Sequence, residues 1–183
     1  MKTTKARSES RRTVYQGRIF RVEVDRVALP SGHTIDMDIV RHPGSVVLLP
    51  MPSAQEIILI RQYRYSIDRW IWELPAGTLK PGEGPVAGAA RECEEEVGLM
   101  PGLVEPLGSF FPTPGFCDEV MHFFRCGDLQ PPTADSTVVK DEDEDLEPRT
   151  FTLDEARALI TSGEIVDLKT VAGLALITSR GGS

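Results

Sequence analysis

Apolar and polar residues alternate in the N-terminal part of the chain. Between residues 20 and 25 the alternation is strict and places Glu23 and Asp25 on the polar side, which is typical of a strand with one buried face. A turn sequence, Leu-Pro-Ser-Gly-His, follows at residues 29–33 and precedes a second alternating segment. Residues 18–41 are therefore predicted to form an antiparallel β-hairpin.

Two short segments are apolar at every position, Val46–Leu49 and Ile57–Ile60. Because a strand with one face in water alternates, these uninterrupted runs predict strands that are covered on both faces. Three further strands are predicted, over residues 70–77, which end in a breaker pair, 103–111 and 120–126.

Helices are predicted in the second half of the chain. The first, over 85–97, begins with proline at an allowed first-turn position and ends at Gly98. A capping-box sequence at 152–155 opens a second helix, which stops near Gly163, and an amphipathic helix follows at about 167–178. This order predicts an α/β fold of the α+β type, with a mixed β-sheet sandwiched between helices and an N-terminal antiparallel β-hairpin.

The composition excludes several classes of protein. Of the 183 residues, 40% are hydrophobic and 26% are charged, which is unlike a disordered, collagenous or membrane-spanning chain. No apolar run approaches the roughly 18 residues of a spanning helix, so no membrane partner is expected. The sequence has no basic stripe, so no nucleic-acid partner is expected. We expect a flexible basic tail at residues 1–13, the hairpin at 14–42 and the main domain at 43–183.

The three cysteines are Cys93, Cys117 and Cys126. Their odd number and the lack of a C-x-x-C spacing fit reduced thiols better than disulfides or a zinc site. The basic N-terminus lacks the apolar stretch of a signal peptide. The expected location is the cytoplasm.

The net charge of −8 is concentrated in two segments. Residues 83–96 hold five glutamates and one arginine, and residues 141–147 hold six acids and no base. The rest of the chain is close to neutral. Such segments bind cations or are solvated surface runs, and their geometry decides between the two.

The predicted helix at 85–97 separates its acids by face. Glu92 and Glu96, four residues apart, lie on one flank about 40° from each other, and Arg91 is placed to pair with Glu95. Two like charges on one flank repel, so a cation between them would compensate, and oxygen ligands favour Mg²⁺ or Mn²⁺. The apolar positions of this helix predict a buried stripe: Val86, Ala89, Ala90, Cys93 and Val97.

Two other residue types suggest substrate contacts. The guanidinium group of Arg64 has the planar fork that binds phosphate, although a surface arginine at a strand end is the alternative. Trp70 and Trp72 could stack on a nucleobase or belong to the core.

The acidic helix also resembles a known motif. Gly77, Glu83 and the run Arg91–Leu99 match the Nudix hydrolase box, Gly-x5-Glu-x7-Arg-Glu-U-x-Glu-Glu-x-Gly-U, at every fixed position. Cys93 stands where the family usually has an aliphatic residue, and a buried cysteine behaves as a small hydrophobe. The sequence thus resembles the Nudix hydrolases, which implies the Nudix fold for residues 43–183.

Similarity to the ADP-ribose pyrophosphatase branch of that family extends over roughly residues 14–178. It includes the lead-in Trp72–Gly77 and Pro114, which lies fifteen residues past Leu99. Further matching segments are Pro114–Glu119, Asp141–Asp145 and Gly163–Asp167.

The resemblance implies a site with two or three Mg²⁺ ions, for which Mn²⁺ could substitute. The implied metal ligands are Glu92, Glu95, Glu96, Glu144 and the carbonyl of Ala76. Glu142 is implied as the base that activates water, with Asp143 as a competitor, and Glu144, Glu96 and Glu95 as further catalytic residues. The implied substrate-binding residues are Arg64, Glu73, Trp72, Glu119 and Gly115.

The activity implied is Mg²⁺-dependent hydrolysis of the pyrophosphate of ADP-ribose to AMP and ribose 5-phosphate. The alternatives are hydrolysis of another nucleoside diphosphate sugar or dinucleotide, and a non-catalytic nucleotide-sensing module. Loss of box glutamates would mark that module, and all of them are present. The resemblance also implies a homodimer that exchanges the N-terminal hairpin.

Overall fold

The chain folds into two units. One comprises residues 1–44 and 111–120, and the other comprises residues 45–110 and 121–183. The computed structural model describes residues 5–133 and 146–180. Within these ranges no helix is long and apolar enough to span a membrane.

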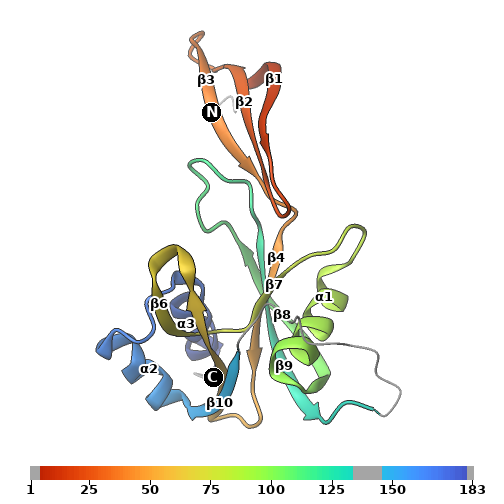
Figure 1. Ribbon diagram of the computed structural model, residues 1–183, viewed down its shortest axis with the longest axis vertical. Coiled ribbons are helices and arrows are strands. Elements are labelled where there is room, and N and C mark those ends of the chain that lie inside the picture. Colours follow the sequence, from red (N-terminus) through yellow and green to blue (C-terminus); the bar gives the residue numbers. More distant parts are fainter. Residues whose placement is uncertain (1–4, 134–145, 181–183) are drawn as a thin grey trace. The chain divides into compact units, whose positions relative to one another are not determined.

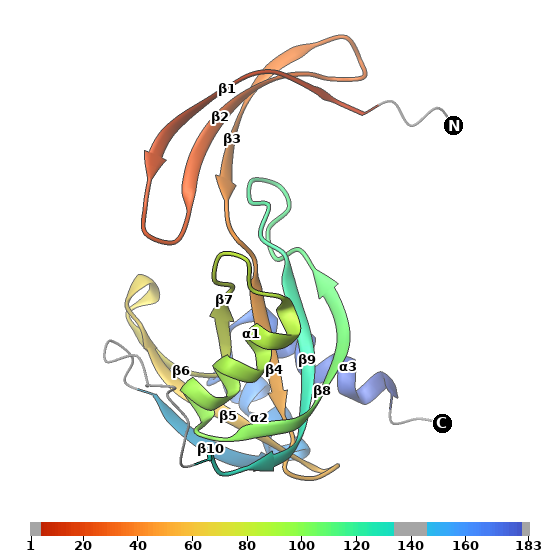
Figure 2. The same ribbon diagram turned by 90° about the vertical axis from the view of Figure 1, so that its right-hand side faces the viewer.

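The first unit contains a three-stranded antiparallel sheet in the order β1-β2-β3, whose strands lie side by side (Figure 2). The strands are β1 (Arg7–Gln16), β2 (Arg21–Ala28) and β3 (Thr34–Arg41). Gly32 closes the β2–β3 turn at a φ of 90°, and its N–H donates to the carbonyl of Leu29 at 2.9 Å. The predicted antiparallel hairpin is confirmed.

Strand β1 begins at Arg7, within the segment expected to be a flexible tail. Every residue of β1 is exposed, which leaves no hydrophobic alternation to reveal a strand. The strand forms because its backbone groups pair with the edge of β2, and backbone pairing does not depend on apolar side chains.

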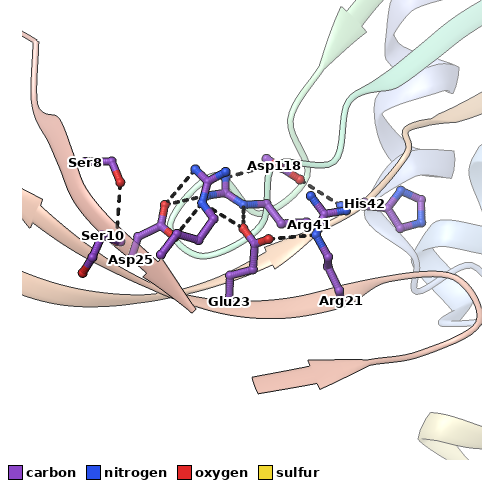
Figure 3. Close-up of polar contacts among 9 residues, drawn as sticks. Ser8, Ser10, Arg21, Glu23, Asp25, Arg41, His42 and Asp118 are labelled. Atoms are coloured by element: carbon purple, nitrogen blue, oxygen red, sulfur yellow. Dashed lines mark hydrogen bonds and ion pairs between the residues drawn. The ribbon is translucent and has the colours of Figure 1, made fainter. Parts of the chain in front are cut away.

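The polar side of β2 is the buried one. Glu23 and Asp25 are 4% and 3% exposed. Arg41 lies between them, donating from Nε to Glu23 Oε2 and from Nη2 to Asp25 Oδ2, both at 2.7 Å (Figure 3). Arg11 of β1 donates to both oxygens of Asp25, at 3.0 and 3.1 Å. Buried carboxylates need such partners, so side chains as well as backbone tie the three strands together.

The second unit contains two sheets. The four-stranded sheet has the order β7-β4-β9-β8 and is mixed, because β4 and β9 run parallel while the other pairs are antiparallel. The three-stranded antiparallel sheet has the order β10-β5-β6. The strands of the two sheets are β4 (Ser45–Pro50), β5 (Glu56–Arg64), β6 (Arg69–Glu73), β7 (Ala76–Thr78), β8 (Met100–Phe110), β9 (Met121–Gln130) and β10 (Glu147–Thr152). A 3₁₀ turn, η1 (Tyr65–Ile67), lies between β5 and β6.

The predicted helices are all present, on both sides of the four-stranded sheet (Figure 1). The predicted helix at 85–97 consists of α1 (Pro85–Glu92) and a π-helical turn, η2 (Cys93–Val97). The other two are α2 (Leu153–Ser162) and α3 (Leu168–Arg180). The predicted capping box at the start of α2 is formed, and Gly163 ends that helix at a φ of 78°.

Strand β4 separates two hydrophobic clusters. Val46 and Leu48 face the cluster that contains Ala89 of α1, and Val47 and Leu49 face the cluster that packs against α2 and α3. Both predicted apolar runs are buried, which confirms that these strands are covered on both faces. The mixed sheet packed by helices on both sides is therefore confirmed.

Candidate active site

The glutamates predicted to bind metal lie where α1 passes into η2. Glu92 is the last residue of α1, whereas Glu96 lies in the π-helical turn. A π-turn has one more residue in its hydrogen-bonded ring than an α-turn, and such turns are frequent at functional sites. The angle expected for a continuous α-helix therefore does not describe this pair. Gly98 ends the segment at a φ of 75°, as predicted.

Glu92 packs directly on the backbone of β7. Its side chain belongs to a buried residue, 7% exposed, and a Cβ atom added at Gly77 would overlap its carboxyl group. Glycine is required here because any larger residue would displace the carboxylate. The motif glycine and the motif glutamate are thus two sides of one contact.

Glu96 holds the neighbouring residue of the same strand. It is 4% exposed, and its Oε2 accepts a hydrogen bond from the N–H of Ala76 at 2.9 Å. Ala76 is the residue whose carbonyl the resemblance implies as a metal ligand. The two buried carboxylates therefore contact two successive residues of β7.

Arg91 orients the glutamates around it. Its Nε and Nη2 donate to the two oxygens of Glu83, each at 2.8 Å, and its Nη1 donates to Glu95 at 2.5 Å and to Glu92 at 2.6 Å. The predicted Arg91–Glu95 pair is confirmed. Hydrogen bonds from Arg91 lower the pKa of Glu83 to about 2, and the carboxylates, Glu83 foremost, raise the pKa of Arg91.

The donor atoms suit a hard divalent cation. Glu92 and Glu96 supply buried carboxylate oxygens, and oxygen ligands of this kind select Mg²⁺ or Mn²⁺ over softer metals. Within residues 5–133 and 146–180, no group of three or more acidic, histidine or cysteine side chains is placed to complete a metal site. The predicted Glu142, Asp143 and Glu144 lie outside the described residues.

Arg64 and Glu73 form a second charged cluster in the same unit. Glu73, at the end of β6, is 1% exposed and accepts from Arg64 Nε at 2.7 Å. Burial tends to lower the pKa of Arg64, but Glu73 outweighs it, and the charges of Glu96 and Asp167 add to the rise in the pKa of Arg64. The Arg64 guanidinium is therefore close enough to interact electrostatically with Glu96 of the first cluster.

Trp72 packs in the core. Its ring meets that of Phe151 edge to face, with centroids 4.9 Å apart, and its backbone N–H donates to the carbonyl of Glu164. Of the two alternatives for the tryptophans, base stacking and core packing, these contacts of Trp72 match core packing. Trp70 is 42% exposed, and the guanidinium carbon of Arg61 lies over its ring, 5.5 Å from the ring centroid.

The predicted substrate residues Gly115 and Glu119 belong to the first unit. Gly115 is exposed, whereas Glu119 follows Asp118, which is held firmly. Asp118 accepts from Arg41 Nη1 at 3.2 Å and from the backbone N–H of His42 at 2.9 Å (Figure 3). Within this unit, β3 and the half-buried Arg41 fix the backbone that carries Glu119.

Sequence reasoning missed Lys169. Its side chain is 8% exposed and forms a close ion pair with Glu73, 96 positions away in the chain. Nothing in the local sequence of the last helix distinguishes this lysine from a solvated one. Its burial in the sequence Asp-Leu-Lys-Thr becomes evident only when the position of Glu73 is known.

The fold and the glutamate helix define a Nudix domain. Residues 40–172 match the NUDIX domain family, and residues 8–37 match the nucleoside diphosphate sugar hydrolase N-terminal domain. The chain belongs to the Nudix family.

Individual relatives share most of the chain. A methanol dehydrogenase activator of Bacillus methanolicus is 39% identical over 86% of this chain and 84% of its own length. An ADP-ribose pyrophosphatase of Bacillus subtilis (strain 168) is 35% identical over 93% of this chain and 91% of its own. The crystal structure of an ADP compounds hydrolase, 22% identical, superposes with a TM-score of 0.81 over 97% of this chain and 94% of that chain, which confirms the predicted Nudix fold.

Proposed function

We propose that the protein hydrolyses the pyrophosphate bond of ADP-ribose, giving AMP and ribose 5-phosphate. The observation that carries the proposal is the pair of buried glutamates, Glu92 against Gly77 and Glu96 bonded to Ala76, in a chain with an intact Nudix box. The similarity to an ADP-ribose pyrophosphatase over nine-tenths of both chains supports ADP-ribose among the nucleoside diphosphate sugars.

The metal would be held by Glu92, Glu96, Glu95 and the Ala76 carbonyl, with Glu144 completing the set. We propose two or three Mg²⁺ ions, replaceable by Mn²⁺. When bound, divalent ions neutralise phosphoryl oxygens and lower the pKa of bound water.

Other residues of the chain act on the substrate and on the attacking water. The Arg64 guanidinium binds a phosphoryl oxygen, because its fork matches that geometry. Glu142 accepts the proton of the attacking water, and Asp143 is the competitor for that role. Gly115, Glu119, Trp72 and Glu73 are the further residues proposed to shape the substrate site.

A hydrolysis screen with Mg²⁺ tests the proposal. ADP-ribose, other sugar nucleotides and dinucleoside polyphosphates are compared, and ADP-ribose is expected to have the highest kcat/KM. If only a different sugar nucleotide is hydrolysed, that compound replaces ADP-ribose as the proposed substrate. If no compound is hydrolysed, the protein is a non-catalytic nucleotide-sensing module.

Two variants separate metal binding from proton transfer. Glu96→Gln should raise the Mg²⁺ concentration needed for half-maximal rate, and its neighbour Glu94→Gln is the matched control. Glu142→Gln should lower kcat by about 10²–10⁴-fold with the Mg²⁺ requirement unchanged. An unchanged kcat would move the base to Asp143 or Glu144.

We also propose a homodimer that exchanges the hairpin at residues 14–42. Large apolar side chains of the first unit are exposed and would be covered by a partner: Val14, Tyr15, Ile19, Phe20, Ile35, Phe111 and Phe116. Light scattering should give a dimer for the full chain and a monomer after removal of residues 1–41. A full-length monomer with full activity would refute the exchange.

The proposed location is the cytoplasm. The odd number of cysteines and the lack of a C-x-x-C spacing support a reducing compartment.

A further inference from the structure

A buried ion network joins the end of β6 to the start of α3. Its centre is Glu73, which is 1% exposed. One carboxylate oxygen, Oε1, accepts from Arg64 Nε at 2.7 Å. The other, Oε2, is paired with the ammonium group of Lys169.

Lys169 is itself held in place from the other side. Asp167, the residue before α3, lies with Oδ2 at 3.2 Å from Lys169 Nζ, and its Oδ1 accepts from the Lys169 backbone N–H at 3.1 Å. Asp167 Oδ2 also accepts from the N–H and the hydroxyl group of Thr170. The lysine is therefore anchored through both its backbone and its side chain.

A second connection fixes the same two segments. The fully buried Thr170 accepts, through Oγ1, the N–H of Leu74 at 2.8 Å. Leu74 follows Glu73 directly and stands two residues before Ala76. The start of α3 thus holds the β6–β7 segment by one ion pair and by one hydrogen bond from the Leu74 N–H to the Thr170 hydroxyl.

The network balances its charges internally. Two carboxylates, Glu73 and Asp167, face two cations, Arg64 and Lys169, and a buried carboxylate is stable only with such partners. Lys169 is paired with Oε2 of Glu73, and Arg64 is bound to Oε1 through Nε. Across the described ranges, the Arg64 guanidinium has only Glu73 as a hydrogen-bond and ion-pair partner, through Nε, so its terminal nitrogens remain available.

We propose that Lys169 is a positioning residue for phosphate binding: it occupies one oxygen of Glu73, so that Arg64 is held by Nε and presents its terminal nitrogens to a phosphoryl group. This inference rests on the proposed function, in which Arg64 binds the substrate. Without Lys169, the free oxygen of Glu73 draws Arg64 into a two-bond pair and removes a nitrogen from the substrate side.

The test compares Lys169→Met, Lys169→Arg and Arg64→Met by KM and kcat for ADP-ribose with Mg²⁺. Lys169→Met should raise KM about tenfold with kcat nearly unchanged, because a ground-state contact is lost. Lys169→Arg keeps the cation and should return KM to within about twofold of wild type. Arg157→Met, which removes an exposed ion pair of α2, is the control and should leave KM unchanged.

A double-variant cycle separates positioning from general damage. In the Arg64→Met background, Lys169→Met should have no further effect on KM, since the residue through which it acts is absent. Fully additive effects would overturn the proposal. If Lys169→Met does not fold, Lys169→Gln, which keeps a neutral hydrogen-bond donor beside Glu73, replaces it in the same cycle, and fully additive effects with Arg64→Met would again overturn the proposal.

Calorimetric binding of ADP-ribose without metal distinguishes this inference from the proposed function. A wild-type protein that binds but turns over nothing would remove the proposed function. A tenfold higher Kd for Lys169→Met, and no further rise in Kd when it is added to Arg64→Met, would then still support the role of Lys169. A wild-type protein that binds no ADP-ribose, or Kd values that Lys169→Met leaves unchanged, would overturn it.

Discussion

Replacing Glu83 by glutamine tests the ion pair that organises the glutamate helix. The carboxylate of Glu83 binds Arg91 through two parallel hydrogen bonds of 2.8 Å, and both side chains are about 15% exposed. Its Oε2 also accepts the N–H of Lys80 at 3.0 Å. Glutamine has nearly the same shape but no charge, so Glu83→Gln removes the attraction and leaves the packing.

The size of the effect follows from the pKa of Glu83. A value of about 2 in the folded chain, against 4.5 otherwise, corresponds to at most about 3 kcal/mol at about 1.4 kcal/mol per pH unit. Solvent reaches the edge of the pair and screens it, so we expect a loss of about 1 kcal/mol at pH 7. Because the folded pKa is lowered, the stabilisation is complete above pH 4.5 and is lost as the pH falls towards 2.

Urea unfolding followed by far-ultraviolet circular dichroism at pH 7, 4.5 and 3 measures the difference between variant and wild type. The difference should stay near 1 kcal/mol down to pH 4.5 and fall to roughly half by pH 3. Glu147→Gln is the control, since that exposed carboxylate lies 3.9 Å from Arg61. Equal stability of the two variants at pH 7, or a difference independent of pH, would refute the reasoning.

Two further substitutions test the contacts around the site and in the first unit. Gly77→Ala should fold with nearly wild-type melting temperature, because the flexible Glu92 carboxylate can move away from the new methyl group. Its Mg²⁺-dependent rate should fall about 10²-fold, since a displacement of a catalytic group by about 1 Å is enough for such a loss. Full activity would show that the contact of Glu92 with residue 77 is not needed. Arg41→Met should speed amide hydrogen exchange throughout β2, as two buried carboxylates lose their shared partner. Arg26→Met, which removes an exposed pair, should not, and equal exchange in both variants would contradict the role of Arg41.

The sequence predicts those elements in which the pattern of apolar side chains reflects the buried faces. Val46–Leu49 and Ile57–Ile60 are apolar at every position because both faces of β4 and β5 are covered. The capping box of α2 is equally local, because its partners, Thr152 and Glu155, are three residues apart. Strand β1 could not be predicted in this way, since its residues are all exposed and only its backbone is engaged.

Alternation along β2 identified two faces but not which of them is covered. Glu23 and Asp25 are buried because Arg41 and Arg11, from the two neighbouring strands, neutralise them. The same limit applies to Glu73 and Lys169, whose pairing spans 96 positions. Ion pairs between distant segments depend on the fold, whereas the box glutamates are recognisable because their spacing along one helix is fixed.

The position of the glutamates depends on more than their helix. Glu92, at the end of α1, packs on Gly77, while Glu96, in the π-turn, binds the N–H of Ala76. Both contacts are to β7, a strand of three residues that pairs with β4 over its full length. A strand this short is held largely by what precedes it, and the preceding segment is fixed to α3 through Glu73 and Leu74. Loosening the start of α3 should therefore disturb the glutamates and Arg64 together, which makes the last helix a structural part of the site although it supplies none of the box residues.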